Sequence, residues 1–312
     1  MNRWFKRHNS TSNMSRVIEN ADREDIRIEG DYDGTIELDQ WFNPKAEHSV
    51  LLILNQKIEL DHSVFEKLWN RYSVKVCADG GANRLYDYFC GDNGERYMPD
   101  VIAGDMDSIR EEVRLFYETH GKTVVIEQKT QYSTDFSKSI NAATLVLLGV
   151  DLNAVEIGGY DGVHKLYEQA DKSKLTSVPL LILNGIDGRF DQTIHSMVQF
   201  YSLQQHDPYY KVCFLTTSDM IILIPSSEKG YWIKVNKMRP MIGNCGLLPL
   251  AGPTNIKRTR GLKWDVENWC SSIAEGQVSS SNRFVGDSCC IACDVPIVMN
   301  IELRWNKIIV EL

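Results

Sequence analysis

Four short segments of the chain place aspartates beside turns, in a pattern suited to binding a cation. They are Asp79–Asn83 (DGGAN), Gly104–Ser108 (GDMDS), Ser133–Lys138 (STDFSK) and Gly188–Asp191 (GRFD). In the first three, an aspartate stands where an apolar, strand-like run gives way to a turn or a helix start. Carboxylates gathered in one place repel one another unless a hard cation lies among them, and Mg²⁺ with a polyphosphate is the usual combination. The pattern therefore indicates chemistry on a nucleotide.

Each segment taken singly also has a purely structural explanation. An Asp-Gly turn is common, and acidic residues favour helix N-termini. Asp135 and Lys138 could form a surface ion pair, and Asp191 could be an ordinary N-cap. The functional interpretation gains weight because the ends of parallel strands converge at one edge of a sheet, where all four segments would meet.

In the functional interpretation, the segments divide into metal ligands and phosphate ligands. The candidate metal ligands are Asp79, Asp105, Asp107 and Asp135. Lys138 lies three residues after Asp135 in a predicted first helical turn, so its ammonium group would project to the same face and bind phosphate oxygens. Arg189 could bind a phosphate near another helix N-terminus. The chain has neither GxxxxGK[ST] nor GxGxxG, which excludes the P-loop and dinucleotide signatures.

Alternating strands and helices are expected to position these segments. Continuous apolar runs predict strands at 49–54, 73–78, 100–103, 123–126 and 178–183. Apolar residues at helical spacing predict helices through Phe136–Leu147 and Ile194–Tyr201, and Ser108 with Glu111 predicts a capping box. This order of elements predicts an α/β fold with a mostly parallel sheet covered on both faces.

The pattern changes after about Pro208 to short β-prone runs separated by glycines and polar turns, beginning with Lys211–Leu215. We expect residues 1–45 to be a partly disordered tail and lead-in, 46–208 to be an α/β catalytic nucleotide-binding domain, and 209–312 to be an all-β sandwich. Residues 151–177, which include the strand-like run Ala154–Ile157, are not assigned.

Two segments of the predicted β-domain carry residues suited to binding an aromatic ring. Trp264 offers a flat face, while Ser281 and Asn282 offer hydrogen bonds to ring nitrogens. The simpler alternative is that Trp264 fills the core of the sandwich.

Bulk properties exclude several classes of protein. A net charge of -8 argues against general nucleic-acid binding, and no apolar run approaches the ~20 residues of a membrane span.

Among 8 cysteines, Cys290 and Cys293 have metal-knuckle spacing, but no second pair completes a zinc site. We therefore expect buried thiols and a reduced, cytoplasmic location. Residues 1–18 are basic and free of acidic residues, which permits an organelle presequence, although a disordered tail is favoured.

The ordered motifs resemble those of the eukaryotic thiamin pyrophosphokinases (thiamine diphosphokinases). The resemblance begins at Leu51 and covers residues 77–83, 99–108, 131–138, 188–192, 261–264 and 278–282. It implies a Rossmann-like catalytic domain, a C-terminal β-sandwich and a homodimer whose active sites use both subunits. It also implies transfer of a pyrophosphoryl group from ATP to the hydroxyethyl oxygen of thiamin, with AMP leaving and Mg²⁺ required.

With this resemblance, each candidate residue receives an expected role. The expected catalytic residues are Asp79, Asp105, Asp107, Asp135 and Lys138, with Asp107 as the acceptor of the thiamin hydroxyl proton. The expected nucleotide contacts are Gly80, Gly81, Asn83, Ser133, Thr134, Arg189 and Asp191. The expected thiamin contacts are Trp264, Ser281 and Asn282. Two departures, Asn184-Gly185 where the family commonly has Gly-Gly and Arg260 where it often has Ser or Thr, bear on substrate geometry rather than on the reaction.

Two other functions are compatible with the same residues. A thiamin- or nucleotide-binding protein could keep the fold without catalysis, and a metal-dependent phosphohydrolase could direct the same carboxylates at water. Release of AMP that depends on thiamin distinguishes the transferase from both.

Overall fold

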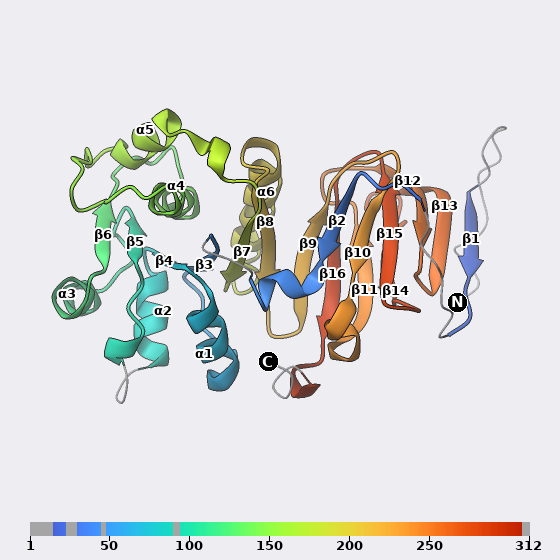
Figure 1. Cartoon of the computed structure of the whole chain (residues 1–312), viewed down its shortest axis with the longest axis horizontal. Coiled ribbons are helices and arrows are strands. Elements are labelled where there is room, and N and C mark those ends of the chain that lie inside the picture. The colour runs from blue at the N-terminus through green and yellow to red at the C-terminus, as the bar shows by residue number, and fades with distance from the viewer. Residues whose placement is uncertain (1–14, 23–29, 45–47, 90–93, 308–312) are drawn as a thin grey trace. The chain divides into compact units, whose positions relative to one another are not determined.

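The computed structural model describes residues 15–22, 30–44, 48–89 and 94–307 (Figure 1). The chain forms two compact units. The first, here called the α/β unit, comprises Asp39–Ile222 and Leu303–Leu312, and the second, the strand-rich unit, comprises Met1–Leu38 and Leu223–Glu302. The described helices include none that is long and apolar enough to cross a bilayer.

The α/β unit is built on a sheet in the order β9-β8-β7-β3-β4-β5-β6. Its strands are β3 (Val50–Ile53), β4 (Val74–Ala78), β5 (Val101–Gly104), β6 (Val124–Glu127), β7 (Val178–Leu183), β8 (Tyr210–Leu215) and β9 (Asp219–Ile224). Neighbouring strands are parallel except for the β8–β9 hairpin. Every residue of β3, β5 and β7 is buried, as expected when helices cover both faces of a parallel sheet.

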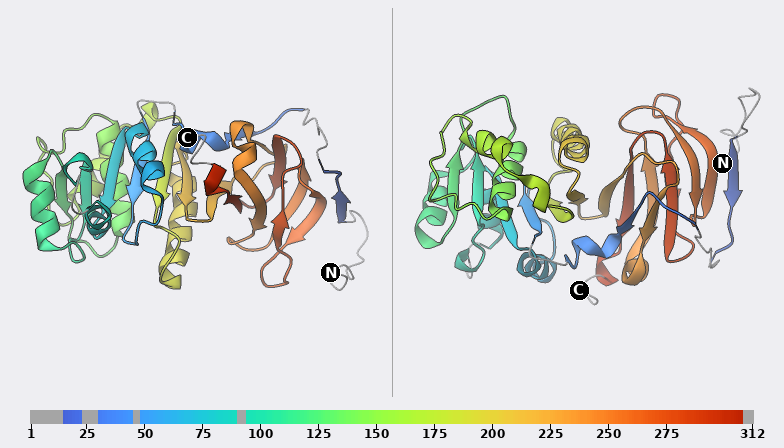
Figure 2. Two further views of the ribbon diagram at one scale, coloured as in Figure 1. Left: turned by 90° about the horizontal axis from the view of Figure 1, so that it is seen from below. Right: turned by 45° about the horizontal axis from the view of Figure 1, so that its top comes forward.

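Among the described residues, six helices cover this sheet. They are α1 (His62–Arg71), α2 (Gly81–Tyr88), α3 (Glu111–His120), α4 (Asp135–Leu147), α5 (Gly162–Gln169) and α6 (Phe190–His206). Figures 1 and 2 show α1, α2 and α3 on one face, and α4, α5 and α6 on the other. The chain adds β4, β5 and β6 on one side of β3, then β7 and β8 on its other side. The sheet order therefore reverses between β3 and β7.

The strand-rich unit contains a six-stranded sheet in the order β1-β13-β12-β15-β10-β2, and a second layer in which β14, β11 and β16 follow one another. The strands are β1 (Arg16–Glu19), β2 (Gly34–Glu37), β10 (Tyr231–Lys234), β11 (Ile242–Leu248), β12 (Thr254–Arg260), β13 (Trp264–Ser271), β14 (Ser279–Asn282), β15 (Ser288–Cys293) and β16 (Ile297–Leu303). Short 3₁₀ helices complete the chain: η1 (Leu38–Trp41), η2 (Gly94–Arg96), η3 (Lys172–Lys174) and η4 (Asn236–Met241). The expected α/β domain and β-sandwich are both present.

The boundaries between the units differ from those expected. Lys211–Leu215 does not begin the all-β domain but lies in β8, which pairs parallel to β7. Within the expected tail, β1 pairs with β13 and β2 pairs with β10. Both are polar edge strands, so their sequences lack the apolar runs that reveal a buried strand. The remainder of the expected disordered tail, residues 1–14 and 23–29, lies outside the described residues.

The unassigned segment 151–177 contains α5 and η3, and its strand-like run 154–157 forms no strand. One local expectation was wrong. The capping box does not form, because α3 begins at Glu111 with Arg110 at its N-cap, and the Ser108 hydroxyl donates to Asp107.

The expectation of buried thiols is confirmed for β15. Cys289, Cys290 and Cys293 are buried, and desolvation raises the pKa of Cys293 to about 12. All seven cysteines that the described residues include are free of disulfides.

Candidate active site

Asp79 is the most deeply placed acidic residue at the carboxyl edge of the parallel sheet. It follows β4 directly, has only 1% of its surface exposed, and adopts a left-handed backbone with φ of 41°. Its carboxylate accepts hydrogen bonds from the backbone N–H groups of Ser108 and Ile109, each at 3.0 Å. Burial, with a further contribution from the nearby Asp135, raises the pKa of Asp79 to about 6, although these two hydrogen bonds oppose the shift.

The glycines after Asp79 allow α2 to begin against the end of β3. A Cβ on Gly81 would lie 2.3 Å from the backbone oxygen of Ile53, and a Cβ on Gly80 would lie 2.3 Å from the side chain of Asn55. Side chains at these positions would push α2 away from the sheet. The glycines therefore set the position of the loop that carries Asp79.

The β5–α3 loop brings two further carboxylates to Asp79. Gly104 permits this approach, because a Cβ there would lie 2.6 Å from the Cβ of Asp79. Met106 has φ of 65°, so the backbone turns between the two aspartates. The turn lets Asp105 accept a hydrogen bond from the N–H of Asp107 at 3.3 Å. One oxygen from each of Asp79, Asp105 and Asp107 lies within 4.8 Å of the others.

The buried Lys138 pairs with the half-buried Asp135 beside this group, so the two do not form the surface ion pair that was the structural alternative. Lys138 is 3% exposed, and its Nζ donates to Asp135 Oδ1 at 3.1 Å and lies 3.9 Å from Asp105 Oδ2. The N–H of Asp105 donates to the same oxygen of Asp135 at 3.1 Å. Burial of Asp135 raises its pKa despite the ammonium group beside it.

The three carboxylates around Asp79 have the ligand chemistry that Mg²⁺ prefers. Their oxygens converge, and within the part of the chain that the structure describes, the ammonium group of Lys138 is the cation that lies beside them. Asp135, expected as a fourth ligand, lies outside this group of three, and its Oδ1 accepts hydrogen bonds from Lys138 and from the Asp105 N–H. The arrangement can bind a divalent cation and place a phosphate beside an amine.

Two of the residues expected to contact the nucleotide already form hydrogen bonds within the protein. Asn83 is 8% exposed; its amide nitrogen donates to the Ser108 carbonyl at 2.8 Å, and its amide oxygen accepts from the Arg110 N–H at 3.0 Å. Thr134 is the N-cap of α4 and accepts from the Ser137 N–H. By contrast, Ser133 has a buried hydroxyl oxygen without a hydrogen-bond partner among the described residues. Asn83 therefore holds the acidic loop, whereas Ser133 is able to bind a ligand.

Arg189 and Asp191 bind each other at the start of α6. The guanidinium group forms two hydrogen bonds to the carboxylate, at 3.1 and 2.6 Å, and both side chains are exposed. Arg189 stands at the N-cap position, so Asp191 is not the N-cap. This loop lies at the same edge of the sheet as Asp79, but neither side chain has a recorded contact with the acidic group.

In the strand-rich unit, the expected thiamin contacts lie on adjoining segments. Asn282, 5% exposed, donates to the backbone carbonyl of Trp264 at 2.8 Å and accepts from its N–H at 3.0 Å. Trp264 is half-buried and has the guanidinium group of Arg283 5.6 Å from its ring centre, while Ser281 is exposed. Asn282 thus holds Trp264 in place, and Trp264 does not fill the core.

Sequence reasoning missed several residues that shape these sites. Gln131 donates a hydrogen bond to Asp105 at 3.0 Å. Burial raises the pKa of Asp105, but this hydrogen bond and the one from the Asp107 N–H lower it more, so the pKa lies below its ordinary value. Asn55, directly after β3, accepts a hydrogen bond from Arg84 at 2.9 Å. The signal was present for Asn55, since it is a polar residue at a strand exit like the aspartates.

Asp265 is another missed residue, in the strand-rich unit. Its carboxylate accepts hydrogen bonds from the N–H groups of Gly261 and Leu262, at 3.0 and 3.2 Å, and from the Thr259 hydroxyl at 2.7 Å. Gly261 has φ of 94°, a conformation that favours glycine. Asp265 therefore closes the turn that presents Trp264.

Family models match both parts of the chain. The model described as the thiamin pyrophosphokinase catalytic domain matches residues 65–212, and the model of the thiamin pyrophosphokinase vitamin B1 binding domain matches residues 231–298. These ranges carry the acidic group and the Trp264 segment, respectively.

Individual relatives agree with the family models over most of their length. The chain is 44% identical over 284 residues to the thiamine pyrophosphokinase of Saccharomyces cerevisiae, covering 84% of this chain and 88% of the relative. It is 30% identical to thiamine pyrophosphokinase 3 of Oryza sativa subsp. japonica, covering 82% and 88%.

Solved structures give the same result. The yeast thiamin pyrophosphokinase crystal structure matches with a TM-score of 0.88 at 41% identity, covering 95% of this chain and 100% of that one. The structure of the Candida albicans enzyme matches with a TM-score of 0.80 at 38% identity, covering 94% and 100%. The chain belongs to the thiamin pyrophosphokinase family.

Proposed function

We propose that this protein is a thiamin pyrophosphokinase, which transfers a pyrophosphoryl group from ATP to the hydroxyethyl oxygen of thiamin and releases AMP. One observation carries the proposal above the others. Three converging carboxylates lie beside a buried lysine, within the part of the chain that the catalytic-domain model matches.

Mg²⁺ is part of the proposal. Asp79, Asp105 and Asp107 would hold it, with Asp135 nearby, since all four offer only oxygen ligands. When bound, Mg²⁺ would neutralise charge on the polyphosphate and favour in-line attack at the β-phosphorus. Asp79 supports this assignment, because burial and the neighbouring Asp135 disfavour its ionised form, which a bound cation would stabilise.

The cationic side chains would bind the phosphate oxygens. Lys138 is held in place by Asp135, so its ammonium group is oriented before any substrate arrives. Arg189 would bind a phosphate after releasing Asp191. The planar guanidinium group can donate two parallel hydrogen bonds to a phosphate, as it does to the carboxylate. Ser133 would supply its unpartnered hydroxyl.

Asp107 remains the proposed acceptor of the thiamin hydroxyl proton. It is exposed and reached from solvent, and its recorded partners are the Ser108 hydroxyl and its own acidic neighbours. Burial raises the pKa of Asp79, but both of its oxygens already accept backbone N–H groups. Substrate positioning contributes more here than strong base catalysis.

Thiamin recognition is assigned to the strand-rich unit. Trp264 would stack on a thiamin ring, and Ser281 would bind the pyrimidine. Asn282 would act partly by holding the Trp264 backbone, given the two hydrogen bonds between them.

The proposal also includes the oligomeric state and the location: the protein would be a homodimer in the cytoplasm. The dimer follows from the family resemblance, and exposed Phe190, Ile194 and Val198 along one face of α6 support an apolar contact. The cytoplasmic location rests on the free thiols of the described cysteines. Sedimentation tests the dimer: a monomer fully active at high dilution would contradict shared active sites.

The direct test of function is a coupled assay for AMP with and without thiamin and Mg²⁺. We expect AMP only when both are present, in equal amount to thiamin diphosphate. ATP loss that is indifferent to thiamin would instead support a phosphohydrolase, and binding without turnover would support a non-catalytic protein.

A further inference from the structure

Two stretches of the α/β unit that lie far apart in the sequence are joined by hydrogen bonds. The first, here called the β6–α4 segment, comprises residues 128–134. The second, here called the supporting loop, comprises residues 158–162 and ends at the start of α5. The backbone N–H groups of Lys129 and Thr130 donate to two carbonyls of the supporting loop, each at 2.9 Å. The loop therefore fixes the main chain of the β6–α4 segment.

Gln128 adds a side-chain connection between the same two stretches. It is 1% exposed, and its amide nitrogen donates to the carbonyl of Gly158 at 3.0 Å and to that of Glu127 at 2.8 Å. Its amide oxygen accepts a hydrogen bond from the N–H of Val163 at 3.0 Å. Both polar atoms of the amide are therefore bonded within the protein, as their burial requires.

The β6–α4 segment also reaches the acidic group. The backbone N–H of Gln128 donates to the carbonyl of the last residue of β5 at 2.7 Å, directly before Asp105. Three residues after Gln128, the side chain of Gln131 donates to Asp105 at 3.0 Å. The hydroxyl of Thr130 accepts from the N–H of Tyr132 at 3.3 Å, which closes the turn around Gln131. The position of Gln131 beside Asp105 thus depends on how this segment is held.

The supporting loop is itself fixed through α5. The N–H of Gly162 donates back to the carbonyl at the start of the loop at 2.9 Å. In the first turn of α5, His164 forms a hydrogen bond of 3.2 Å with Asn141 of α4. In the last turn, the hydroxyl of Tyr167 donates to Asp207, which is buried before β8. Because α5 is attached near both of its ends, the loop is a firm support.

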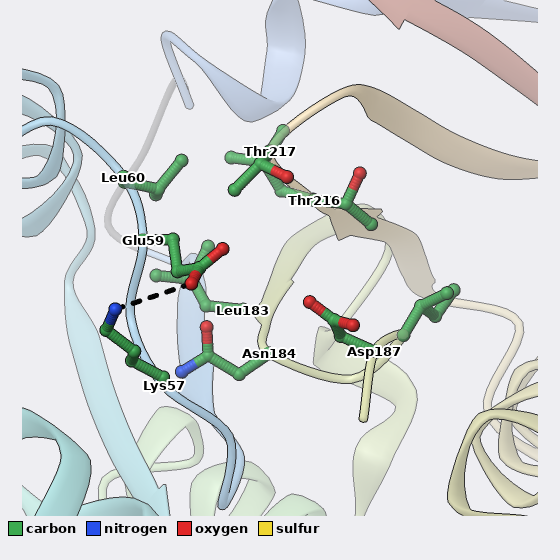
Figure 3. Close-up of a pocket in the computed structure, with 10 residues that line it drawn as sticks. Lys57, Glu59, Leu60, Leu183, Asn184, Asp187, Thr216 and Thr217 are labelled. Carbon is green, nitrogen blue, oxygen red and sulfur yellow. Dashed lines mark hydrogen bonds and ion pairs between the residues drawn. The ribbon is translucent and has the colours of Figure 1, made fainter. Parts of the chain in front are cut away.

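This arrangement is separate from the pocket of the same unit. The pocket opens between β3 and β7, and its lining includes Glu59, Asn184 and Thr216 (Figure 3). The supporting loop instead bonds to the chain after β6, the edge strand of the sheet. It therefore bears on the loop after β5 rather than on the pocket.

An exposed glutamine such as Gln131 needs support in order to hold a carboxylate in one orientation. A long side chain loses rotamer freedom when it binds a single partner, and a fixed backbone limits the positions from which it must do so. Groups that hold metal ligands in place typically contribute about 10- to 100-fold to metal affinity or activity. Support of Gln131 is therefore expected to affect the chemistry as well as the stability.

We propose that Gln128 is a positioning residue for Asp105, and that it acts by joining the supporting loop to the segment that carries Gln131. The inference rests on the proposed function, because Asp105 is one of the proposed ligands of Mg²⁺. It gives the chain between α4 and β7 a part in organising the acidic group.

The first experiment removes the amide with Gln128→Met, which keeps the length of the side chain. Tyr167→Phe is the matched control, because it removes a buried hydrogen bond at the other end of α5. We expect both variants to have a lower melting temperature. Only Gln128→Met should raise the Mg²⁺ concentration needed for half-maximal AMP release, by about tenfold or more. An equal Mg²⁺ requirement in the two variants would contradict the proposal.

The second experiment tests the route from Gln128 to Asp105 with Gln131→Met. Gln131 is exposed, so this variant should fold like the wild type, and its Mg²⁺ requirement should rise as much as that of Gln128→Met. The double variant should need no more Mg²⁺ than either single variant, because residues that act through one contact are not additive. An unchanged requirement in Gln131→Met, or additive effects in the double variant, would overturn the proposal.

Binding of Mg²⁺ alone, measured by calorimetry, separates this inference from the proposed function. Binding by Gln128→Met that is about tenfold weaker than by Tyr167→Phe would support the positioning role whether or not thiamin is a substrate. Equal binding by the two variants would refute it, even in an enzyme that releases AMP only with thiamin.

Discussion

The loops after β4 and β5 and the loop after β7 carry similar motifs, but their side chains are organised in opposite ways. Asp79, Asp105 and Lys138 are buried or half-buried and held by backbone N–H groups or by one another. Arg189 and Asp191 are exposed and bind only each other among their recorded contacts. The first region is organised before substrate binds, whereas the second must rearrange to take part. Four predictions test this contrast.

The largest effect should come from Asp105→Asn. Loss of one charge from an organised group should lower kcat on the order of 10²-fold or more, because the remaining groups cannot compensate at the moment of transfer. The AMP assay on folded protein measures it, with Glu118→Gln as the exposed control. Near-normal turnover would remove Asp105 from the proposed metal site.

The buried region should also show a stability that falls as pH rises, a dependence opposite in sign to that of Asp191, whose pKa Arg189 lowers. Burial raises the pKa of Asp79 from 3.8 to about 6, so the native state keeps a proton that the unfolded state loses between about pH 4 and 6. Stability without divalent cations should therefore fall as pH rises through this window. The difference in unfolding free energy between the wild type and Asp79→Asn should fall by about 2 kcal/mol.

Urea unfolding of both proteins in chelator at pH 4.5, 5.5 and 7 measures this difference. Asn keeps the tolerance of left-handed φ at this position, so a constant offset is expected alongside the slope. A difference that does not change with pH would mean that Asp79 ionises normally. Addition of Mg²⁺ at pH 7 should stabilise the wild type more than the variant.

A smaller effect should come from the exposed region through Arg189→Ala. Because Arg189 must first leave Asp191, it contributes less than an organised group, and kcat/KM for ATP should fall about tenfold. The melting temperature should not change measurably, since exposed ion pairs add little stability. A loss as large as that of Asp105→Asn would mean that the loop is already organised in solution.

The smallest effect, and the sharpest test of the contrast, is Asp191→Asn. If Asp191 competes with phosphate for Arg189, its neutralisation should lower the KM for ATP about two- to threefold. If Asp191 instead contacts the nucleotide or the metal directly, activity should fall. The sign of the change therefore decides between competition and direct participation.

The sequence predicted the parallel sheet well because apolar runs such as Leu180–Leu183 are long, continuous and bounded by turns. It failed at β1 and β2, where edge strands of four residues with few apolar side chains resemble a linker. It also misplaced β8, because a buried strand reads the same in a parallel sheet as in a sandwich. The strand with which β8 pairs is decided by contacts between residues that are far apart in the sequence.

For the candidate site, the sequence predicted which residue types are present but not the role of each residue. Asp79 and Asp105 stood out because several motifs placed aspartates at the strand exits of one predicted sheet. The position of Asn83 in the same motif suggested a nucleotide contact, but its amide is committed to the backbone of the acidic loop. Gln131 gave no signal, since a lone glutamine is ordinary until its partner is known.

What the sequence determined by itself is therefore the chemistry that this protein can perform: the family, the acidic motifs and the sheet edge on which they stand. The tertiary structure decided which side chains are committed to one another, from the Lys138–Asp135 pair to the pocket between β3 and β7. The physical reason is that hydrogen bonds and burial depend on distances in space, and Gly104 or Met106 sets such a distance only once the strands around it have packed.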